Sequence, residues 1–138
     1  MTLPTDGNAP LNNPSHLTEH QRVSDALALL VTTPWIALPF QTGWANFGAP
    51  FEFGAYRKVG DVVQLQGLVG GPIGATTIAT LPVGFRPKRQ HIFLLGNNGN
   101  SSVMRVDVWV DGTVATAGNP VAGGWITLSG VTFSTTGL

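Results

Sequence analysis

The fold is decided by residues 56–69, which read Tyr-Arg-Lys-Val-Gly-Asp-Val-Val-Gln-Leu-Gln-Gly-Leu-Val. From Asp61 onward the apolar residues alternate, and one face holds Val63, Leu65 and Val69 with Gly67 between them. A period of two residues that is rich in β-branched side chains is typical of a half-buried strand. This face is therefore predicted to lie in a dry core.

The opposite face of the same stretch carries Gln64 and Gln66 between Val62 and Leu68. A face of this mixed kind suits a contact with another subunit, so we assign Gln64 and Gln66 to a candidate trimer interface. The alternative is an ordinary sheet surface, because single apolar residues are common on protein surfaces.

Short strands separated by Gly-, Pro- or Asn-rich turns continue on both sides of this stretch. Strands are expected at 76–81, 90–95, 105–110 and 125–134, with two more in the aromatic-rich residues 35–55. Residues 90–95 are apolar on both faces, which is typical of a central or interfacial strand. In 125–134 the apolar parity changes at Gly130, where a β-bulge would keep both halves on the core side. This spacing predicts an all-β fold, an antiparallel, jelly-roll-like β-sandwich.

A helix and an extended arm are expected before the strands. Residues 1–14 contain three prolines and are predicted to be an arm or linker, residues 15–33 a short α-helical stem, and residues 34–138 the head domain. The helix repeats residues at coiled-coil spacing, namely His20, Val23, Leu27 and Leu30. We predict that these four form a short parallel bundle at a symmetry axis between subunits. The alternative is packing against the chain's own sheet, because so short a helix is marginal in water by itself.

The same helix contains His16-Leu17-Thr18-Glu19-His20, which matches the H-x-x-E-H pattern of one class of zinc peptidase. Two histidines four residues apart share a helix face, but a catalytic zinc needs a third protein ligand. The remaining histidine, His91, lies in an apolar strand. We therefore predict no metal site, with a ring of histidines around an ion at a symmetry axis as the alternative.

Catalysis is not expected elsewhere in the chain either. General acid–base or nucleophilic catalysis needs paired side chains within reach of one another. The spacing of Glu52, Asp107 and Asp111 favours no such pair. We predict that the protein is not an enzyme, has no catalytic residue and uses no cofactor.

Composition limits the remaining classes of function. Charged residues make up only 10% of the chain and hydrophobic residues 43%, whereas soluble domains carry roughly 25% charged residues. A formal net charge of zero argues against a nucleic-acid partner, which requires a basic surface. The chain has no cysteine, no apolar run long enough to insert in a membrane and no secretory signal pattern at its start. Display on a virion that is released at host lysis would fit these properties.

The first candidate binding surface is the strand 105–110. Arg105, Asp107 and Trp109 share one face, before a hairpin turn at Asp111-Gly112. A tryptophan beside charged hydrogen-bonding groups is what a saccharide platform needs. The alternatives for Trp109 are insertion into a neighbouring subunit or burial beneath a loop.

Two further groups of residues are assigned to saccharide binding. The polar loop after residue 95 contains Asn97, Asn98 and Asn100, whose amides both donate and accept hydrogen bonds and so match sugar hydroxyls. The alternative for this loop is a simple turn. Trp44 lies in a loop-like stretch between Gly43 and Ala45 and is predicted to be exposed.

Several of these segments, in this order, resemble the head domains of bacteriophage tail-fibre and receptor-binding proteins. They are Tyr56-Arg57-Lys58, Gly60, Val63-Gln64-Leu65-Gln66-Gly67, residues 78–87 (Ile-Ala-Thr-Leu-Pro-Val-Gly-Phe-Arg-Pro) and residues 125–133 (Trp-Ile-Thr-Leu-Ser-Gly-Val-Thr-Phe). The segment at 16–20 is similar to the short helix that precedes such heads in phage minor tail proteins. The resemblance covers roughly residues 35–138.

The resemblance implies a homotrimer with a β-sandwich head on a helical stem, displayed on the tail or head of a virion. Its implied partners are a host cell-wall saccharide, bound during host adsorption, and other virion proteins, held through the N-terminal arm or helix. Two other classes stay open at this point. One is a structural head-fibre or capsid decoration protein that binds no receptor, and the other is a monomeric lectin-like module.

Overall fold

The computed structural model describes residues 31–71, 77–98, 103–117 and 124–137. Its strands all belong to one compact unit, residues 32–138. The predicted arm and residues 15–30 of the predicted stem lie outside the described residues. The predicted end of the stem at residue 33 is wrong, because Thr32 forms an antiparallel bridge with Val59 and the Thr33 amide donates to the Lys58 carbonyl (2.9 Å). Within the described part, every regular element is a strand and every pairing is antiparallel, which confirms the all-β prediction. No helix there is long and apolar enough to cross a membrane.

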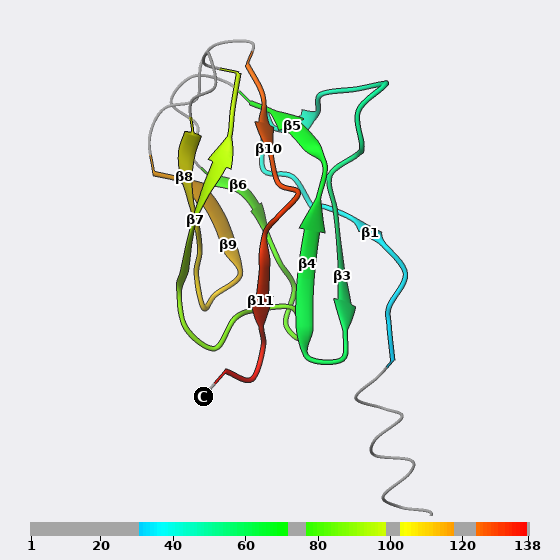
Figure 1. Ribbon diagram of the computed structural model, residues 1–138, viewed down its shortest axis with the longest axis vertical. Coiled ribbons are helices and arrows are strands. Elements are labelled where there is room, and N and C mark those ends of the chain that lie inside the picture. The colour runs from blue at the N-terminus through cyan, green and yellow to red at the C-terminus, as the bar shows by residue number, and fades with distance from the viewer. Residues whose placement is uncertain (1–30, 72–76, 99–102, 118–123, 138) are drawn as a thin grey trace, which may run out of the picture. The chain divides into compact units, whose positions relative to one another are not determined.

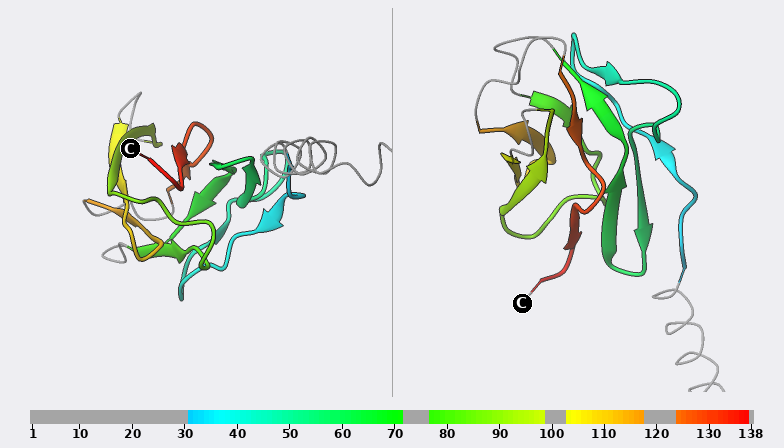
Figure 2. Two further views of the ribbon diagram at one scale, coloured as in Figure 1. Left: turned by 90° about the horizontal axis from the view of Figure 1, so that it is seen from below. Right: turned by 45° about the horizontal axis from the view of Figure 1, so that its top comes forward.

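The strands form two layers, which can be followed in Figures 1 and 2. One layer is the sheet β6-β9-β8-β7. Its strands are β6 (Thr77–Thr80), β7 (His91–Gly96), β8 (Val103–Val108) and β9 (Thr113–Thr116). The predicted strands at 76–81 and 90–95 are therefore present. The strand predicted at 105–110 begins and ends two residues earlier.

The other layer consists of two sheets, and the chain passes directly from one to the other. The sheet β1-β3-β4-β11 contains β1 (Ile36–Ala37), β3 (Ala55–Val59), β4 (Val62–Gln66) and β11 (Thr132–Ser134). The sheet β10-β5-β2 contains β10 (Ile126–Thr127), β5 (Leu68–Gly70) and β2 (Ala45–Asn46). Because β4 runs into β5 through Gly67 alone, the two sheets form one bent layer (Figure 1).

The stretch 56–69 behaves as its alternation predicts, but it contains more than one strand. β3 and β4 pair as a hairpin with Val59 opposite Val62, around a turn at Gly60-Asp61. On β4 and β5 the inward residues Val63, Leu65 and Val69 are buried, which confirms the predicted core face. They pack with Val106, Val108 and Val114 of the other layer and with the last two strands.

The predicted strand at 125–134 is broken where its parity changes. The Val131 amide donates to the Leu128 carbonyl (3.1 Å), closing a tight turn over Ser129-Gly130 between β10 and β11. The four apolar residues on the two sides of the turn are all buried, as predicted. They are Ile126, Leu128, Val131 and Phe133. A turn rather than a simple bulge restores the parity.

Residues 90–95 were predicted to be a central or an interfacial strand, and the central position is wrong. β7 is the end strand of its sheet, and residues 91–95 of its outer edge pair with no described strand. Only at Asn97 does the chain bridge to Ile126 in β10. The side chains of Ile92 and Leu94 point outward, with Leu94 69% exposed. Their hydrophobicity therefore marks an open surface and not burial on both faces.

The C-terminal residues are held by the turn of the β3–β4 hairpin. The hydroxyl groups of Thr136 (2.7 Å) and Ser134 (3.1 Å) donate to one Asp61 carboxylate oxygen, and the Thr135 amide donates to the Asp61 carbonyl (2.8 Å). The hydrogen bonds from the hydroxyl groups of Thr136 and, less strongly, Ser134 lower the pKa of Asp61 from its ordinary value. The ionised carboxylate thus stabilises the folded state at pH values above its ordinary pKa. This stabilisation is lost as the pH falls and the group is protonated.

Gly67 lies where two backbone segments touch. Its φ is +112°, and a methyl group at this position would lie 2.5 Å from the backbone of Gly54. We predict that Gly67→Ala lowers the free energy of unfolding by about 3 kcal/mol, the sum of backbone strain and overpacking. Gly130 is a matched control, because its φ is +115° and nothing lies within 4 Å of an added methyl group. Gly130→Ala should cost only about 1 kcal/mol, and equal losses in urea unfolding would contradict the close-contact explanation.

The interactions of Asp61 predict a specific pH dependence of stability. The melting temperature of the wild type should fall more steeply between about pH 5 and pH 3 than that of Asp61→Asn, because only the carboxylate loses its hydrogen bonds on protonation. Thr136→Val should remove part of the same dependence. Asp111, whose pKa is lowered by the Thr113 amide, is unchanged in both variants and so contributes equally. Parallel pH profiles for the three proteins would show that Asp61 does not anchor the C-terminus.

Candidate binding site

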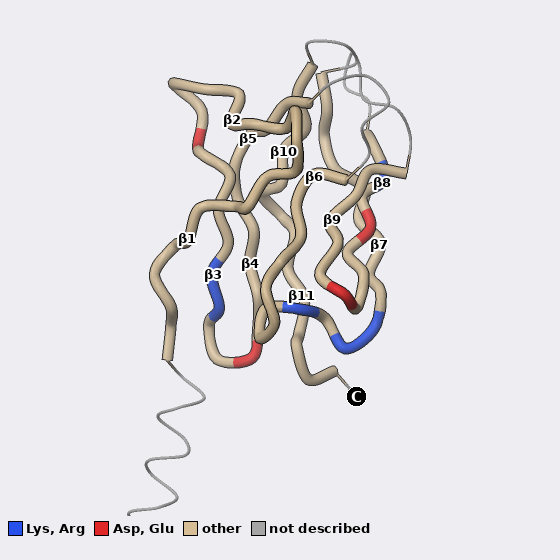
Figure 3. The backbone as a smooth tube through the Cα atoms, turned by 180° about the vertical axis from the view of Figure 1, so that it is seen from behind, with Lys and Arg blue, Asp and Glu red and all other residues tan. Residues whose placement is uncertain are grey.

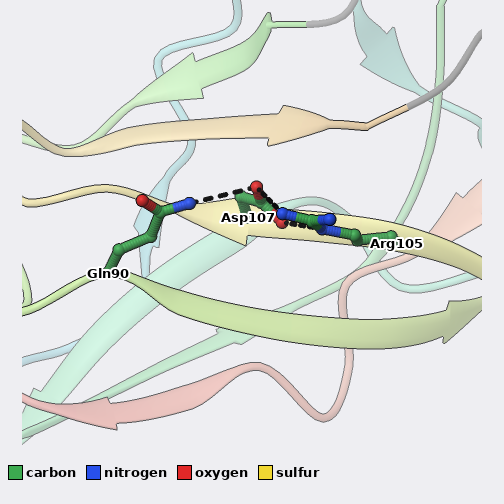
Figure 4. Close-up of polar contacts among 3 residues, drawn as sticks. All are labelled: Gln90, Arg105 and Asp107. Carbon is green, nitrogen blue, oxygen red and sulfur yellow. Dashed lines mark hydrogen bonds and ion pairs between the residues drawn. The ribbon is translucent and has the colours of Figure 1, made fainter.

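Arg105 and Asp107 lie together on the outward face of β8, as predicted, but they bind each other. Arg105 donates from Nε (2.8 Å) and Nη2 (2.9 Å) to the two Asp107 oxygens, and Gln90 Nε2 donates to the second oxygen (3.1 Å), as Figure 4 shows. Asp107 is only 6% exposed, whereas the Arg105 side chain is about half exposed. Hydrogen bonds from its guanidinium to Asp107 raise the pKa of Arg105. The Asp107 carboxylate therefore braces the β7–β8 hairpin and is not available to a sugar.

Trp109 lies beyond the end of β8 and is 46% exposed. The Gly112 amide donates to the Trp109 carbonyl (2.9 Å), which forms the predicted hairpin turn with Asp111 and Gly112. Val110, the last residue of the strand predicted at 105–110, lies in this turn and is exposed. Trp109 is thus an accessible side chain at a hairpin tip. The acidic residue of β8, Asp107, is already bonded to Arg105.

The predicted asparagines lie at the opposite end of the same hairpin. β7 and β8 pair from His91↔Val108 to Gly96↔Val103, so Asn97 and Trp109 follow opposite ends of a ladder about 17 Å long. Asn98 is exposed, and its backbone N–H donates to the Trp125 carbonyl (3.2 Å). Asn100 lies outside the described residues. One sugar ring cannot contact both Trp109 and the asparagine loop.

The prediction that Trp44 is exposed is wrong. It is buried, its ring lies directly against Gly71, and its Nε1 finds no hydrogen-bond acceptor among the described residues. With Asn97 and Met104 it borders an enclosed space of only about 10 Å³. Gly43, Trp44 and Ala45 look loop-like in sequence, but the ring fills the end of the core between the two layers.

A groove lies on the outer face of β4, where the sequence had not indicated a binding site. Its volume is about 390 Å³, within the range of roughly 300–1,000 Å³ that is usual for small-molecule sites. Gln64, Gln66 and Trp35 line it, together with the turn residues 129–132. We call this feature the β4 groove. The sequence signal for it was the pair of outward glutamines, which was interpreted as a subunit contact.

Trp35 and Gln64, which line the β4 groove, are held in place by Arg57 at its border. The Arg57 guanidinium lies over the Trp35 ring, 4.5 Å from its centre, and Arg57 Nε donates to Gln64 Oε1 (2.9 Å). Trp35 is 39% exposed, so its indole has a fixed orientation and still meets solvent. The Gln66 amide has no hydrogen-bond partner among the described residues. The groove therefore combines an aromatic surface with amide and hydroxyl groups.

A second open hollow of about 350 Å³ lies where the segment before β7 meets the end of the chain. Lys88, Arg89, His91 and Ser134 are among the residues that line it. Basic positions lie close together along the segment that leads into β7, as Figure 3 shows, because Arg86, Lys88 and Arg89 follow one another there. Elsewhere the charges are sparse. Within the described residues no three His, Asp or Glu side chains are grouped so as to hold a metal ion. The motif at 16–20 lies outside those residues.

The two tryptophans of the predicted site should differ sharply in their contribution to stability. Trp44→Ala should lower the free energy of unfolding by about 3–5 kcal/mol, because it empties the end of the core. Trp109→Ala should change it by less than about 1 kcal/mol, since half of that side chain already meets solvent. Chemical denaturation measures both. If Trp44→Ala lowers the free energy of unfolding only slightly, Trp44 would again be a candidate ligand contact.

Comparison with known proteins rests on structure alone. No protein-family profile matches the chain, and no curated protein sequence matches it. The chain is similar in structure to the receptor-binding protein gp15 of Listeria phage PSA, with a TM-score of 0.57 and 16% identity over 95% of this chain and 88% of that one. It is also similar to the head domain of the receptor-binding protein of lactococcal phage bIL170, with a TM-score of 0.51 and 20% identity over 73% of this chain and 96% of that one. The resemblance to phage receptor-binding heads that residues 56–67 and 78–87 indicated is thus confirmed at the level of the fold. This chain has the β-sandwich-like fold of phage receptor-binding head domains.

Proposed function

We propose that this protein is a bacteriophage virion surface protein, a receptor-binding module of a tail fibre or minor tail protein. It attaches the particle to a saccharide of the host cell surface and works as a homotrimer. The observation that carries the proposal is the structural likeness to two phage proteins whose own names state receptor binding, because it extends over most of this chain and of theirs.

The surface chemistry of the described residues supports a binding role over catalysis. The buried carboxylate Asp107 is engaged with Arg105, and Asp61 is engaged with Ser134 and Thr136. Neither is left free for acid–base work. The chain instead exposes aromatic, amide and hydroxyl groups with no net charge, which suits an uncharged, hydroxyl-rich ligand.

An apolar patch on the outer face of β7 and β8 supports the homotrimer. It consists of Ile92, Leu94 and Val103, all more than half exposed, beside the unpaired edge of β7. Contiguous exposed apolar side chains are costly in water, and a second copy of the chain would cover them. This patch replaces Gln64 and Gln66 as the part of the head that we assign to subunit contact.

Binding of the purified protein to bacteria tests the proposal. Fluorescently labelled protein is applied to a panel of Listeria and lactococcal strains, because the two similar proteins come from phages of these bacteria. We expect saturable binding to some strains, removed by competition with polysaccharide extracted from their walls. Light scattering should give about 43.5 kDa, three chains of 14.5 kDa. Leu94→Glu should lower this mass, whereas Val83→Glu, which alters an equally exposed residue outside the patch, should not.

Two results would overturn parts of this proposal. A trimer that binds none of the strains and none of the extracted polysaccharides would favour the structural alternative, a fibre or decoration protein without a receptor. A monomer that binds cells would remove the trimer and leave the receptor-binding role.

A further inference from the structure

We propose that the β4 groove is the saccharide site of this protein and that it takes an uncharged sugar ring. This inference rests on the proposed function and adds to it the location of the site and the class of the ligand. We prefer the β4 groove to the site predicted from sequence at Arg105, Asp107 and Trp109, because the two charged groups there are already bonded to each other.

The first step in the argument is the fixed aromatic surface. Trp35 immediately precedes β1, and β1 pairs with β3 so that Ile36 faces Tyr56. This pairing brings Trp35 beside Arg57, whose guanidinium covers the indole ring at 4.5 Å. Because Arg57 occupies one face of the indole, a sugar would stack on the opposite face, and the restricted orientation of the ring means that little conformational entropy is lost on binding.

The second step is the supply of hydrogen-bonding groups. Gln64 and Gln66 point outward from β4 into the groove, and Ser129 and Thr132 border its other side. Gln64 Oε1 already accepts from Arg57, so the amide is oriented with its NH₂ group remaining as a donor. The Gln66 amide, which has no described partner, can donate and accept at once. Amide and hydroxyl groups of this kind match the hydroxyl groups of a sugar.

The third step is charge. The lining residues of the β4 groove include no acidic or basic side chain, and Arg57 stands at its border with Nε and its ring-facing surface already engaged. A cation would find no carboxylate there. An anionic polymer would instead be drawn to the hollow lined by Lys88 and Arg89. The groove therefore suits an uncharged ring better than a phosphate or carboxylate group.

The β4 groove is also stable in shape, because the core holds both of its walls. Leu65 and Val131, which are buried beneath it, are joined by a backbone hydrogen bond from the Leu65 amide to the Val131 carbonyl (3.0 Å). The turn at its far side is fixed by the Gly67 amide, which donates to Ser129 Oγ (3.1 Å). A preformed site of this kind needs no rearrangement to bind a ligand.

Nuclear magnetic resonance of the indole N–H groups tests the site in the full chain. The four tryptophans give four indole signals, and Trp35→Phe identifies that of Trp35. Glucose, galactose, rhamnose and N-acetylglucosamine are added one at a time to about 50 mM, since one ring is expected to bind with a Kd on the order of 1 mM. We expect at least one sugar to shift the Trp35 signal in a saturable way and to leave that of Trp109 in place.

Matched variants connect this shift with the β4 groove. Trp35→Ala and Gln66→Ala should each weaken binding of that sugar about tenfold or more. Trp109→Ala and Gln41→Ala, which remove a tryptophan and a glutamine side chain that are exposed outside the groove, should leave the affinity unchanged. Gln66→Ala guards against misfolding, because its side chain has no described partner to lose.

Each contrary outcome overturns a different statement. A shift of the Trp109 signal, with binding lost in Trp109→Ala, would move the site to the hairpin tip and leave the receptor-binding function intact. Binding to whole cells without any response to the four sugars would overturn the uncharged-sugar assignment. A change of solution mass in Gln66→Ala would make the groove a subunit contact. Absence of binding to any cell or polysaccharide would overturn the proposed function itself.

Discussion

The contact between the backbones of Gly54 and Gly67 is the constraint on which the bent layer depends. At this crossing the chain passes from β4 into β5 and from one small sheet into the next. The Gly67 carbonyl accepts from the Leu128 amide (2.8 Å), and the Gly54 carbonyl accepts from the Leu38 amide (3.1 Å). Because no side chain separates the two segments, four parts of the chain are joined within one small region. The bend lets a single layer cover both the middle and the end of the core.

The few charged residues in the described part of the chain mostly bind neighbouring side chains. Asp107 bridges Arg105 and Gln90, Asp61 binds the C-terminal hydroxyl groups, and Arg57 lies between Trp35 and Gln64. In these cases an ionic group orders neighbouring side chains instead of creating a field that acts at long range. Recognition by such a surface must therefore rely on shape, stacking and hydrogen bonds, with little electrostatic steering.

Much of the fold could be predicted from the sequence, because period-two alternation and Gly-rich turns report directly on half-buried strands. The core face of β4, the β8–β9 hairpin turn and the burial of residues on both sides of Gly130 follow from local pattern alone. The position of β7 at a sheet edge did not follow, since an apolar strand looks the same when it is central and when it is exposed. Trp44 was assigned to the surface because its flanking glycine and alanine suggest a loop, although the contact that buries it is with Gly71, far along the chain.

The candidate site was harder to predict for the same reason. Arg105 and Asp107 are adjacent on one face of a strand, and alternation alone cannot tell whether they face a ligand or each other. The β4 groove combines residues near 35, 57, 64–66 and 129–132, which only the strand order brings together. Its one local signal, a pair of outward glutamines, is shared by many ordinary sheet surfaces.

Alternate residues of β4 belong to the core and to the β4 groove. This alternation affects which substitutions the head can accept. A slip of β4 by a single residue would turn Val63 and Leu65 outward and bring Gln64 and Gln66 into the core. Such a slip would disrupt the core and the β4 groove together. A molecule with a misassembled core could therefore not keep an intact groove. In evolutionary terms, the outward positions are free to vary in chemistry as long as the inward ones keep the register, which separates a change of ligand from a change of fold.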